Sequence, residues 1–480
     1  MLIGIDVGTT AVKAALFDLK GNQLRSFGER YATARPLAGQ VEQNPDDWLR
    51  LVLAALTALS DGVPSGGIKA IGLCSQVNTH VFADESGHAL MPAMTWQDGR
   101  CANEAAKLNE QISDAEKLSW WGAPLPIDSS HILARMAYVQ KHHPDNWRKT
   151  DWVLAPKDYC IMQLTGAVVT DPMTSFGIID SSLTKLPRLM ELVQGAEPRL
   201  PPLAGFTEVI GNIRHGLPCA GTPMVTGAMD AWSGLLGAGV CDDGQCVYLS
   251  GTSEILGIVS SQKRPTAGVI AFPKCEGIVL HAGPTQSGGA SVEWLSRLLG
   301  RTADEISVLA ASVDTKKALP LFLPHLEGER APLWDINARA SISGLSSAMG
   351  APELARAVLE GVGYSARLVL EALEASACCK PSVINHSGGG ASPDIWCQIR
   401  ADILGRPIQR TKVRDAGVLG AAMMAGVGSG WFLSLRNAAR EFVQMDRVFE
   451  PDAAEQKRHA NGFALYRSLY RDLVPFNAAL

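Results

Sequence analysis

A short segment near the N-terminus, DVGTT at residues 6–10, combines residue types that suit a nucleotide polyphosphate. Gly8 permits a tight turn after an apolar strand, and Thr9 and Thr10 offer hydroxyl and backbone donors. Lys13 adds a positive charge one short strand away. Asp6, at the end of the strand, is a candidate ligand for hydrated Mg²⁺. The alternative is an ordinary hairpin in a sheet, which this segment alone does not exclude.

A second strand–turn–strand pattern, CVYLSGTSEILGIVS at residues 246–260, resembles the pattern at residues 2–18. Gly251 follows Gly8 by 243 positions (251 − 8), which is close to half of the 480 residues. Both turns bring small residues, hydroxyls and backbone N–H groups together, as anion-binding turns do. We therefore expect a duplicated architecture with two phosphate-facing turns and a cleft between them. Gly251 and Thr252 are the candidates in the second turn.

The run Gly388-Gly389-Gly390-Ala391 follows a predicted strand and precedes a predicted helix. Glycines allow a base or ribose to approach the backbone closely, and a helix N-terminus favours anions. The alternative is a tight loop without a ligand. The dinucleotide pattern G-x-G-x-x-G is absent here, and the P-loop pattern G-x-x-x-x-G-K-[ST] is absent from the whole chain.

Asp230 lies among small residues, shortly after Gly227, where a predicted strand gives way to a predicted helix. A carboxylate in this position can accept a proton from a hydroxyl such as that of a sugar. It can equally be an acid stabilised by the positive end of the helix dipole. The residues alone leave both interpretations open.

Short apolar strands alternate with amphipathic helices along the chain, which predicts an α/β fold. Asn44 and Pro45 are typical of a helix start, and that helix should run to about Ser60. The pattern interruption near residues 240–244 predicts two domains, 1–241 and 242–480. The other expected elements are strands at 68–73, 152–155, 223–227 and 381–386, and helices from 156, at 228–238, at 392–404 and at 454–480.

The composition is that of an ordinary globular protein, with 19% charged and 46% apolar residues and a net charge of −5. Without a Lys/Arg-rich run, nucleic acid and anionic membranes are not expected partners. No secretory signal is visible, and the 10 cysteines are scattered without a C-x-x-C pair. We therefore expect reduced thiols in a cytoplasmic protein.

Further motifs occur in order along the chain, and together they resemble the FGGY carbohydrate kinase family, most closely its xylulokinase-like members. The resemblance covers almost the whole chain and implies two actin-like (ribonuclease H-like) domains with ATP and Mg²⁺ in the cleft between them. The segments that carry it are EQNP (42–45), CSQVN (74–78), WQDGR (96–100), KDY (157–159), LTG (164–166), TD (170–171), GAMD (227–230), GTS (251–253), FLPHLEGERAP (322–332), GGGA (388–391) and GAA (420–422).

The resemblance also implies roles for individual residues of a sugar kinase. Asp230 would be the catalytic base and Asp6 the metal ligand. The sugar, a small ketose and foremost a ketopentose such as xylulose, would contact Gln76, Val77, Asn78, Trp96, Asp98 and Arg100. The nucleotide would contact Thr9, Thr10, Lys13, Gly251, Thr252, Gly289, Gly389, Gly390 and Ala391.

The chain departs from the family pattern mainly at residues that are expected to bind the sugar. Val77-Asn78 stands where xylulokinase-like members carry Met-His, and residues 120–131 also differ. In the glycine-rich segment, Pro393 replaces the usual Ser. A tetritol, tetrulose, glycerol or other polyol is therefore an alternative substrate. A second alternative is a non-kinase ATPase of the actin-like superfold, but such a protein would lack the W-x-D-x-R segment. A third is an inactive sugar-binding regulator, and the intact Asp230 argues against it. A homodimer is left open.

Overall fold

The computed structural model describes residues 1–480, which divide into two compact units. Unit 1 comprises Met1–Gly239, Phe272–Gly277 and Asp415–Val443, and unit 2 comprises Val240–Ala271, Ile278–Arg414 and Gln444–Leu480. The compact units therefore differ from a single division after residue 241, because two later segments belong to unit 1.

Unit 1 is built on a seven-stranded mixed sheet. β1 pairs antiparallel with β2 and parallel with β5, and β10 continues the parallel part. β11 (Ala228–Met229) pairs with the end of β5. The order across the sheet is β3 (Gln23–Arg30), β2 (Ala11–Phe17), β1 (Leu2–Val7), β5 (Ala70–Ser75), β10 (Pro223–Val225) and β9 (Val209–Asn212).

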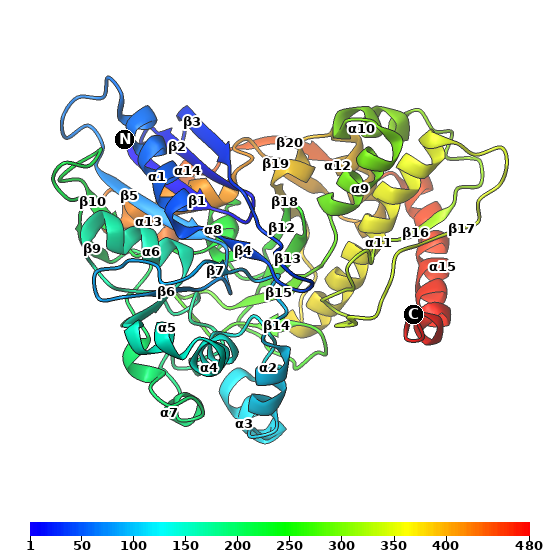
Figure 1. The fold of residues 1–480 in the computed structure, drawn as a ribbon. Helices are drawn as coiled ribbons and strands as arrows, with labels where there is room; N and C mark the ends of the chain where they lie inside the picture. Colours follow the sequence, from blue (N-terminus) through cyan, green and yellow to red (C-terminus); the bar gives the residue numbers. More distant parts are fainter. The chain divides into compact units, whose positions relative to one another are not determined.

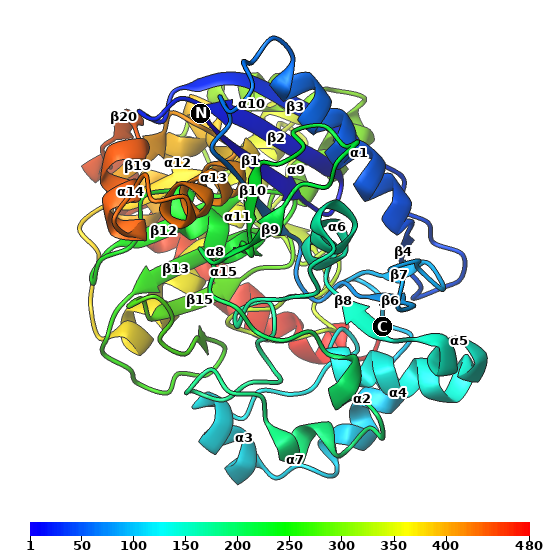
Figure 2. The ribbon, with the colours of Figure 1, turned by 90° about the vertical axis from the view of Figure 1, so that its left-hand side faces the viewer.

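Helices cover both faces of this sheet. α1 (Pro45–Ser60) and α6 (Pro156–Thr165) lie on one face, and α8 (Asp230–Gly237) and α13 (Ala416–Gly428) lie on the other (Figure 2). α13 packs so closely on β1 that a Cβ at Gly4 would lie 1.9 Å from the Val418 carbonyl oxygen. The core beneath α1 includes Trp48, Leu51 and Leu56, as its apolar spacing predicts.

The rest of unit 1 consists of small helices and two-stranded ribbons. The short helices α2–α5 and α7 gather beyond the edge of the sheet (Figure 1). The ribbons pair β4 with β7 and β6 with β8. The bounds are β4 Glu42–Gln43, β6 Val81–Ala83, β7 Ala93–Met94, α2 Ala102–Asn109, α3 Asp114–Trp121, α4 Ile132–His142, α5 Pro144–Lys149, β8 Trp152–Leu154, α7 Pro187–Met190, the 3₁₀ turn Glu197–Arg199 and α14 Leu435–Phe442.

Unit 2 contains a second seven-stranded sheet, with strand order β14-β15-β13-β12-β18-β19-β20. β12 pairs antiparallel with β13 and parallel with β18, and β19 adds a further parallel strand. The strands are β12 Cys246–Ser250, β13 Glu254–Val259, β14 Ile270–Ala271, β15 Leu280–Pro284, β18 Ile384–Ser387, β19 Ile408–Thr411 and β20 Met445–Phe449, with the ribbon β16 Leu321–Leu323 and β17 Ser341–Ser343. The helices are α9 Gly289–Leu299, α10 Ala303–Ala311, α11 Ala351–Ala377, α12 Asp394–Leu404 and α15 Ala453–Asn477, with a 3₁₀ turn at Gly389–Ala391.

The two sheets share one plan, which confirms the duplication expected from the sequence. The series β3-β2-β1-β5-β10-β9 in unit 1 corresponds to β15-β13-β12-β18-β19-β20 in unit 2, with the same parallel and antiparallel pairings. The turn at Gly8 therefore corresponds to the turn at Gly251. None of the helices is long and apolar enough to cross a membrane.

Most expected elements form, with bounds shifted by one to three residues. The helix expected from residue 228 begins at Asp230, because Ala228 and Met229 pair with β5 as strand β11. The helix expected from residue 392 begins at Asp394, with Pro393 in an extended conformation at its N-cap. The helix after Asn44 begins as expected, and the Asn44 side chain accepts a hydrogen bond from the Asp46 N–H.

Candidate active site

Asp6 stands at the end of β1, in the middle of the sheet of unit 1. It pairs with Lys13 of β2 on one side and with Cys74 of β5 on the other. Its Oδ1 atom is buried and has no hydrogen-bond partner. Burial and the nearby carboxylate of Asp230 raise its pKa to about 7, and the opposing influence of Lys13 is smaller. Asp6 is thus an acidic group with an unused ligand atom, close to a second acid.

Lys13 is tied to an acid that comes from the far end of the sequence. Its Nζ atom lies 2.5 Å from Oδ1 of Asp415, the residue at the N-cap of α13. Both side chains are nearly half exposed, so the pair remains open to solvent or to a ligand. Burial alone would lower the pKa of Lys13, but Asp415 outweighs it and the pKa is raised. Lys13 therefore carries a positive charge beside Asp6.

Asp230 is the first residue of α8, directly after the strand pair of β11 and β5. Its Oδ1 accepts a hydrogen bond of 2.7 Å from the Ala231 N–H. The chain reaches this position through Gly227, which has φ +69°, and a Cβ there would lie 1.8 Å from the Leu73 carbonyl oxygen. Only glycine fits this approach, so the backbone before Asp230 is fixed by the sheet.

A buried ion cluster around Lys157 also holds the segment that leads to Asp230. Lys157 Nζ lies 2.6 Å from Asp158 and 2.9 Å from Asp171, and it donates a hydrogen bond of 3.3 Å to the Thr226 carbonyl. The Lys157 backbone N–H donates to Oγ of Ser75. The two acids outweigh burial, so the pKa of Lys157 is raised and its charge is retained. This cluster holds the chain just before Gly227 and Asp230.

The first predicted phosphate turn forms between β1 and β2. It is closed by a hydrogen bond of 3.1 Å from the Gly8 N–H to the Ala11 carbonyl. Thr10 is exposed, whereas the Thr9 hydroxyl accepts a hydrogen bond of 3.0 Å from the indole N–H of Trp96. Trp96, a predicted sugar contact, is therefore connected directly to the predicted phosphate turn.

Gln76 lies within a buried chain of amides and hydroxyls. It is 1% exposed, its Nε2 donates to Gln43 at 2.8 Å, and its Oε1 accepts from Thr79 at 3.2 Å. Gln43 in turn donates to the Thr9 carbonyl, and Thr79 accepts from the Trp96 backbone N–H. Gln76 is thus placed to hold the Thr9 turn and Trp96 in position.

Asp98 and Arg100 form a compact ion pair with Glu42. Both Asp98 oxygens accept hydrogen bonds from the Arg100 guanidinium, and Oδ2 also accepts from the Val41 N–H at 2.7 Å. Arg100 also contacts Glu42 at 2.7 Å. Asp98 is 1% exposed, and its oxygens are occupied by protein donors. This pair fixes the loop that carries Trp96.

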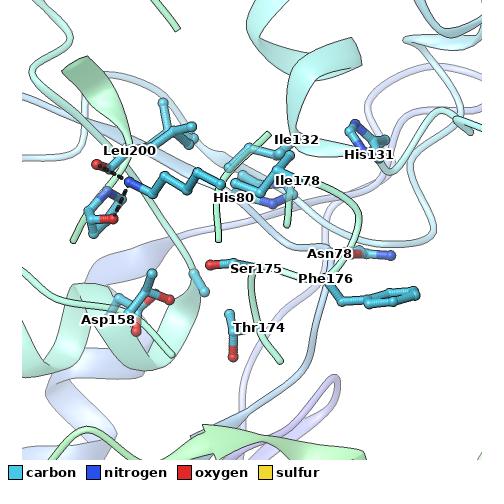
Figure 3. Close-up of a pocket in the computed structure, with 15 residues that line it drawn as sticks. Asn78, His80, His131, Ile132, Asp158, Thr174, Ser175, Phe176, Ile178 and Leu200 are labelled. Carbon is cyan, nitrogen blue, oxygen red and sulfur yellow. Dashed lines mark hydrogen bonds between the residues drawn. The ribbon is translucent and has the colours of Figure 1, made fainter. Parts of the chain in front are cut away.

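Val77 and Asn78 are partly exposed, and Asn78 lines a small cavity whose walls are partly polar and partly apolar (Figure 3). The cavity has a volume of about 30 Å³, which is enough for a water molecule or a ligand hydroxyl but not for a whole sugar. Asn78 has φ +53° and donates to Oγ of Ser130 at 3.2 Å. Oγ1 of Thr174 in the wall is buried without a partner. The other lining residues include His80, His131, Asp158, Thr170, Ser175, Phe176 and Lys185.

In unit 2, the second predicted turn joins β12 to β13. The Gly251 N–H donates to the Ser253 carbonyl at 2.9 Å. The start of α9 is fixed to this turn, because the Gly289 N–H donates to the Gly251 carbonyl at 2.9 Å and the Gly288 N–H donates to Thr252 at 3.0 Å. A Cβ at Gly289 would lie 2.6 Å from the Gly251 carbonyl oxygen, so a side chain would open the contact.

The glycine-rich segment forms the connection between β18 and α12, also in unit 2. Gly388 has φ +97°, and a Cβ there would lie 2.4 Å from the Ser250 carbonyl oxygen. A Cβ at Gly390 would lie 2.2 Å from Oγ of Ser250. Gly389 has open space around it, and Ala391 is buried. The glycines therefore allow this turn to pack directly on the second predicted phosphate turn.

No group of three or more His, Cys, Asp or Glu side chains is arranged to hold a metal ion. Mg²⁺, however, is commonly bound through one or two carboxylates together with phosphate oxygens and water. The free Oδ1 of Asp6, beside a second acid, fits a role of this kind.

Sequence reasoning missed Asp415 and the supporting role of Lys157. Asp415 lies 402 residues after Lys13, and only the glycine- and alanine-rich helix that follows it signals close packing on the sheet. Lys157 and Asp171 were part of recognised motifs, but their shared contact depends on tertiary structure.

Comparisons with known proteins concern the family and the fold of the chain. The model for the N-terminal domain of the FGGY family of carbohydrate kinases matches residues 1–237, and the model for its C-terminal domain matches residues 246–429. The xylulose kinase of Escherichia coli (strain K12) is 29% identical over 497 residues, with 100% of both chains covered.

Two solved structures have the same fold. A gluconate kinase from Lactobacillus acidophilus superposes with a TM-score of 0.87 at 27% identity, covering 98% of this chain and 97% of its own. A ligand-bound xylulose kinase from the same organism also gives 0.87, at 26% identity with 98% of each chain covered. Equal similarity to proteins named for two substrates means that the fold alone does not select the sugar.

Proposed function

Because the chain belongs to the FGGY family of carbohydrate kinases, we propose that it transfers the γ-phosphoryl group of ATP to a hydroxyl of a small ketose. The observation that carries the proposal is the grouping of Asp6, Asp230 and the Lys13–Asp415 pair around the first turn of unit 1. Phosphoryl transfer requires an acceptor for the attacking proton, a positive charge near the phosphates and a ligand for the metal. This group of residues supplies all three.

In this reaction Asp230 accepts the proton of the attacking hydroxyl. Lys13 places positive charge beside the transferred group, and the Gly8–Thr10 turn offers backbone and hydroxyl donors. Asp6 would hold Mg²⁺ directly or through water. The bound ion would neutralise charge on the phosphate oxygens. In unit 2, the turns at Gly251 and Gly389 would bind the rest of the nucleotide, with their tight packing fixing the direction of their N–H groups.

The first candidate substrate is a ketopentose such as xylulose, supported by the names of the E. coli relative and of one solved structure. Asn78 supports the alternative, a tetritol, tetrulose, glycerol or other polyol. Its side chain is shorter than the His of xylulokinase-like members, is uncharged and is hydrogen-bonded to Ser130. The only polar group that its side chain offers at the cavity is therefore an amide.

A coupled ADP-release assay over ketopentoses, tetruloses, gluconate and polyols tests the proposal. D-xylulose is expected to give the highest kcat/KM, and Asp230→Asn should lower the rate of release by about 100-fold or more with every substrate. If no sugar or polyol stimulates ADP release above the rate with water alone, the kinase assignment is wrong. If a four-carbon compound exceeds D-xylulose, the polyol alternative replaces the first candidate.

A further inference from the structure

A buried arginine in unit 2 contacts both turns that were assigned to the nucleotide. Arg400, in α12, is fully buried. One terminal nitrogen donates to Oγ of Ser250 at 2.7 Å and also contacts Glu254, the residue that opens β13. The other terminal nitrogen donates to the Gly390 carbonyl at 2.7 Å. A single guanidinium thus links the second phosphate turn with the glycine-rich turn.

The surroundings of Arg400 fix its position and satisfy its charge. The guanidinium lies 3.8 Å from the ring centroid of Trp396 and 4.8 Å from that of Tyr248. Burial would lower the pKa of Arg400, but Tyr248 and Glu254 outweigh it and the pKa is raised. His386, whose pKa is lowered by burial and by Arg400, stays neutral and can accept a hydrogen bond from it.

Glu254 is equally buried and equally satisfied. One of its oxygens accepts a hydrogen bond from Oγ of Ser250 at 2.7 Å, and the other accepts from the Tyr248 hydroxyl. Its backbone N–H is bonded to the hydroxyl of Thr285, and its carbonyl accepts from the Thr285 N–H at 2.8 Å. Glu254 therefore fixes the start of β13, the strand that follows the predicted phosphate turn, and Arg400 in turn fixes the Glu254 carboxylate.

Stability alone does not account for such a pair. A buried ion pair replaced by well-packed neutral groups is often as stable or more stable, because both charges must lose their hydration. A pair of this kind can instead specify one arrangement among several. Here the arrangement is tight: Gly388 and Gly390 pack on Ser250 at distances that leave no room for a Cβ.

We propose that Arg400 and Glu254 act as a positioning pair that keeps the two turns in register and thereby sets the affinity for ATP. The proposal rests on the proposed function, in which both turns bind the nucleotide. The pair does not touch the reacting atoms. Its loss should change nucleotide binding while leaving recognition of the sugar by unit 1 unchanged.

Three variants separate positioning from general stability. Arg400→Met/Glu254→Gln removes both charges together and so leaves no unpaired buried charge, while breaking the links to Ser250 and Gly390. Arg400→Lys retains a charge for Glu254 but loses the planar fork that reaches both turns. Arg356→Met/Glu360→Gln is the control, because it neutralises another buried pair of unit 2, at 2.6 Å, within α11. Glu360 also pairs with Arg458, which keeps Glu455 as its partner in this variant.

The measurements are ATP and ADP dissociation constants by calorimetry, KM for ATP and for the sugar, and the thermal unfolding midpoint. The Arg400→Met/Glu254→Gln variant should unfold within a few degrees of the unmodified protein. We expect its ATP affinity to fall about 10- to 100-fold, with the sugar KM unchanged, since misplacing binding groups by about 1 Å can cost that much. Arg400→Lys should weaken ATP binding in the same direction, and the control pair should not.

Unchanged ATP affinity in the folded Arg400→Met/Glu254→Gln variant or in Arg400→Lys would overturn the positioning role. The same holds if the control pair weakens ATP binding equally, since any buried pair would then suffice. If the unmodified protein itself binds neither ATP nor ADP, the proposed function fails first, and the positioning role fails with it.

Discussion

Replacing Asp6 with asparagine should stabilise the ligand-free protein, and the gain should grow as the pH rises. The pKa of Asp6 is raised from 3.8 to about 7 by burial and by the Asp230 carboxylate. Between these two values the folded state binds a proton that the unfolded chain has lost, so stability falls as the pH rises. Asparagine does not titrate, and Asp6→Asn therefore avoids this loss.

The size of the effect follows from the shift. One pKa unit corresponds to about 1.4 kcal/mol, so a shift of about 3 units is worth about 4 kcal/mol in total. Between pH 5 and pH 8 the part that changes is about 2 to 3 kcal/mol, an upper value because solvent partly reaches the residue. The linkage applies to the protein free of Mg²⁺ and nucleotide, since a bound cation would favour the ionised carboxylate.

Urea denaturation of the unmodified protein and of Asp6→Asn, at pH 5 and pH 8 in EDTA, measures the difference directly. Asp61→Asn is the control, because Asp61 is an exposed acid of the same unit. The stabilisation by Asp6→Asn should be larger at pH 8 than at pH 5, with no such trend in the control. A difference between the two proteins that is the same at both pH values would refute the buried acidic pair.

Three further substitutions test the site. Asp230→Asn should lower kcat by about 100- to 10,000-fold while ATP binding by calorimetry stays nearly unchanged; retention of most turnover would remove Asp230 as the base. Thr252→Val should raise KM for ATP and leave KM for the sugar unchanged, whereas Thr9→Val should raise both, because the Thr9 hydroxyl also holds the Trp96 indole. Asn78→His should change the ratio of kcat/KM for D-xylulose to that for a four-carbon ketose with little effect on ATP affinity, and a constant ratio would exclude Asn78 from specificity.

The features predicted well from sequence are those with local causes. The helix after Asn44 forms because an N-cap, a proline and acids lie within four residues of one another. The two turns at Gly8 and Gly251 form because an apolar strand, a glycine and a second apolar strand are adjacent in sequence. Their equivalence could be inferred from the repeat and appears in the structure as two sheets of the same strand order.

The features missed depend on partners distant in sequence. Lys13 is paired with Asp415, and neither residue has a neighbour in the sequence that predicts the other. The segments that return to unit 1, Phe272–Gly277 and Asp415–Val443, have no compositional break that marks them. The second segment is placed by helix α13, whose small residues allow it to approach β1 and β5 closely. In the first segment, Phe272 packs against Phe176 and Trp232.

Hydrogen bonds within the protein change how substitutions of two predicted sugar contacts, Asp98 and Gln76, should be interpreted. A side chain can bind a hydroxyl only with donors or acceptors that remain available, and both oxygens of Asp98 are already occupied by Arg100 and the Val41 N–H. Gln76 uses one amide hydrogen on Gln43, and its amide oxygen accepts a hydrogen bond from Thr79. Both networks end at Trp96 or at the loop that carries it, so loss of either residue is expected to move Trp96 in addition to any direct effect on the sugar. Discrimination among sugars must then come from groups with unused capacity that face solvent or the cavity, and Asn78 is the predicted sugar residue that best meets that condition.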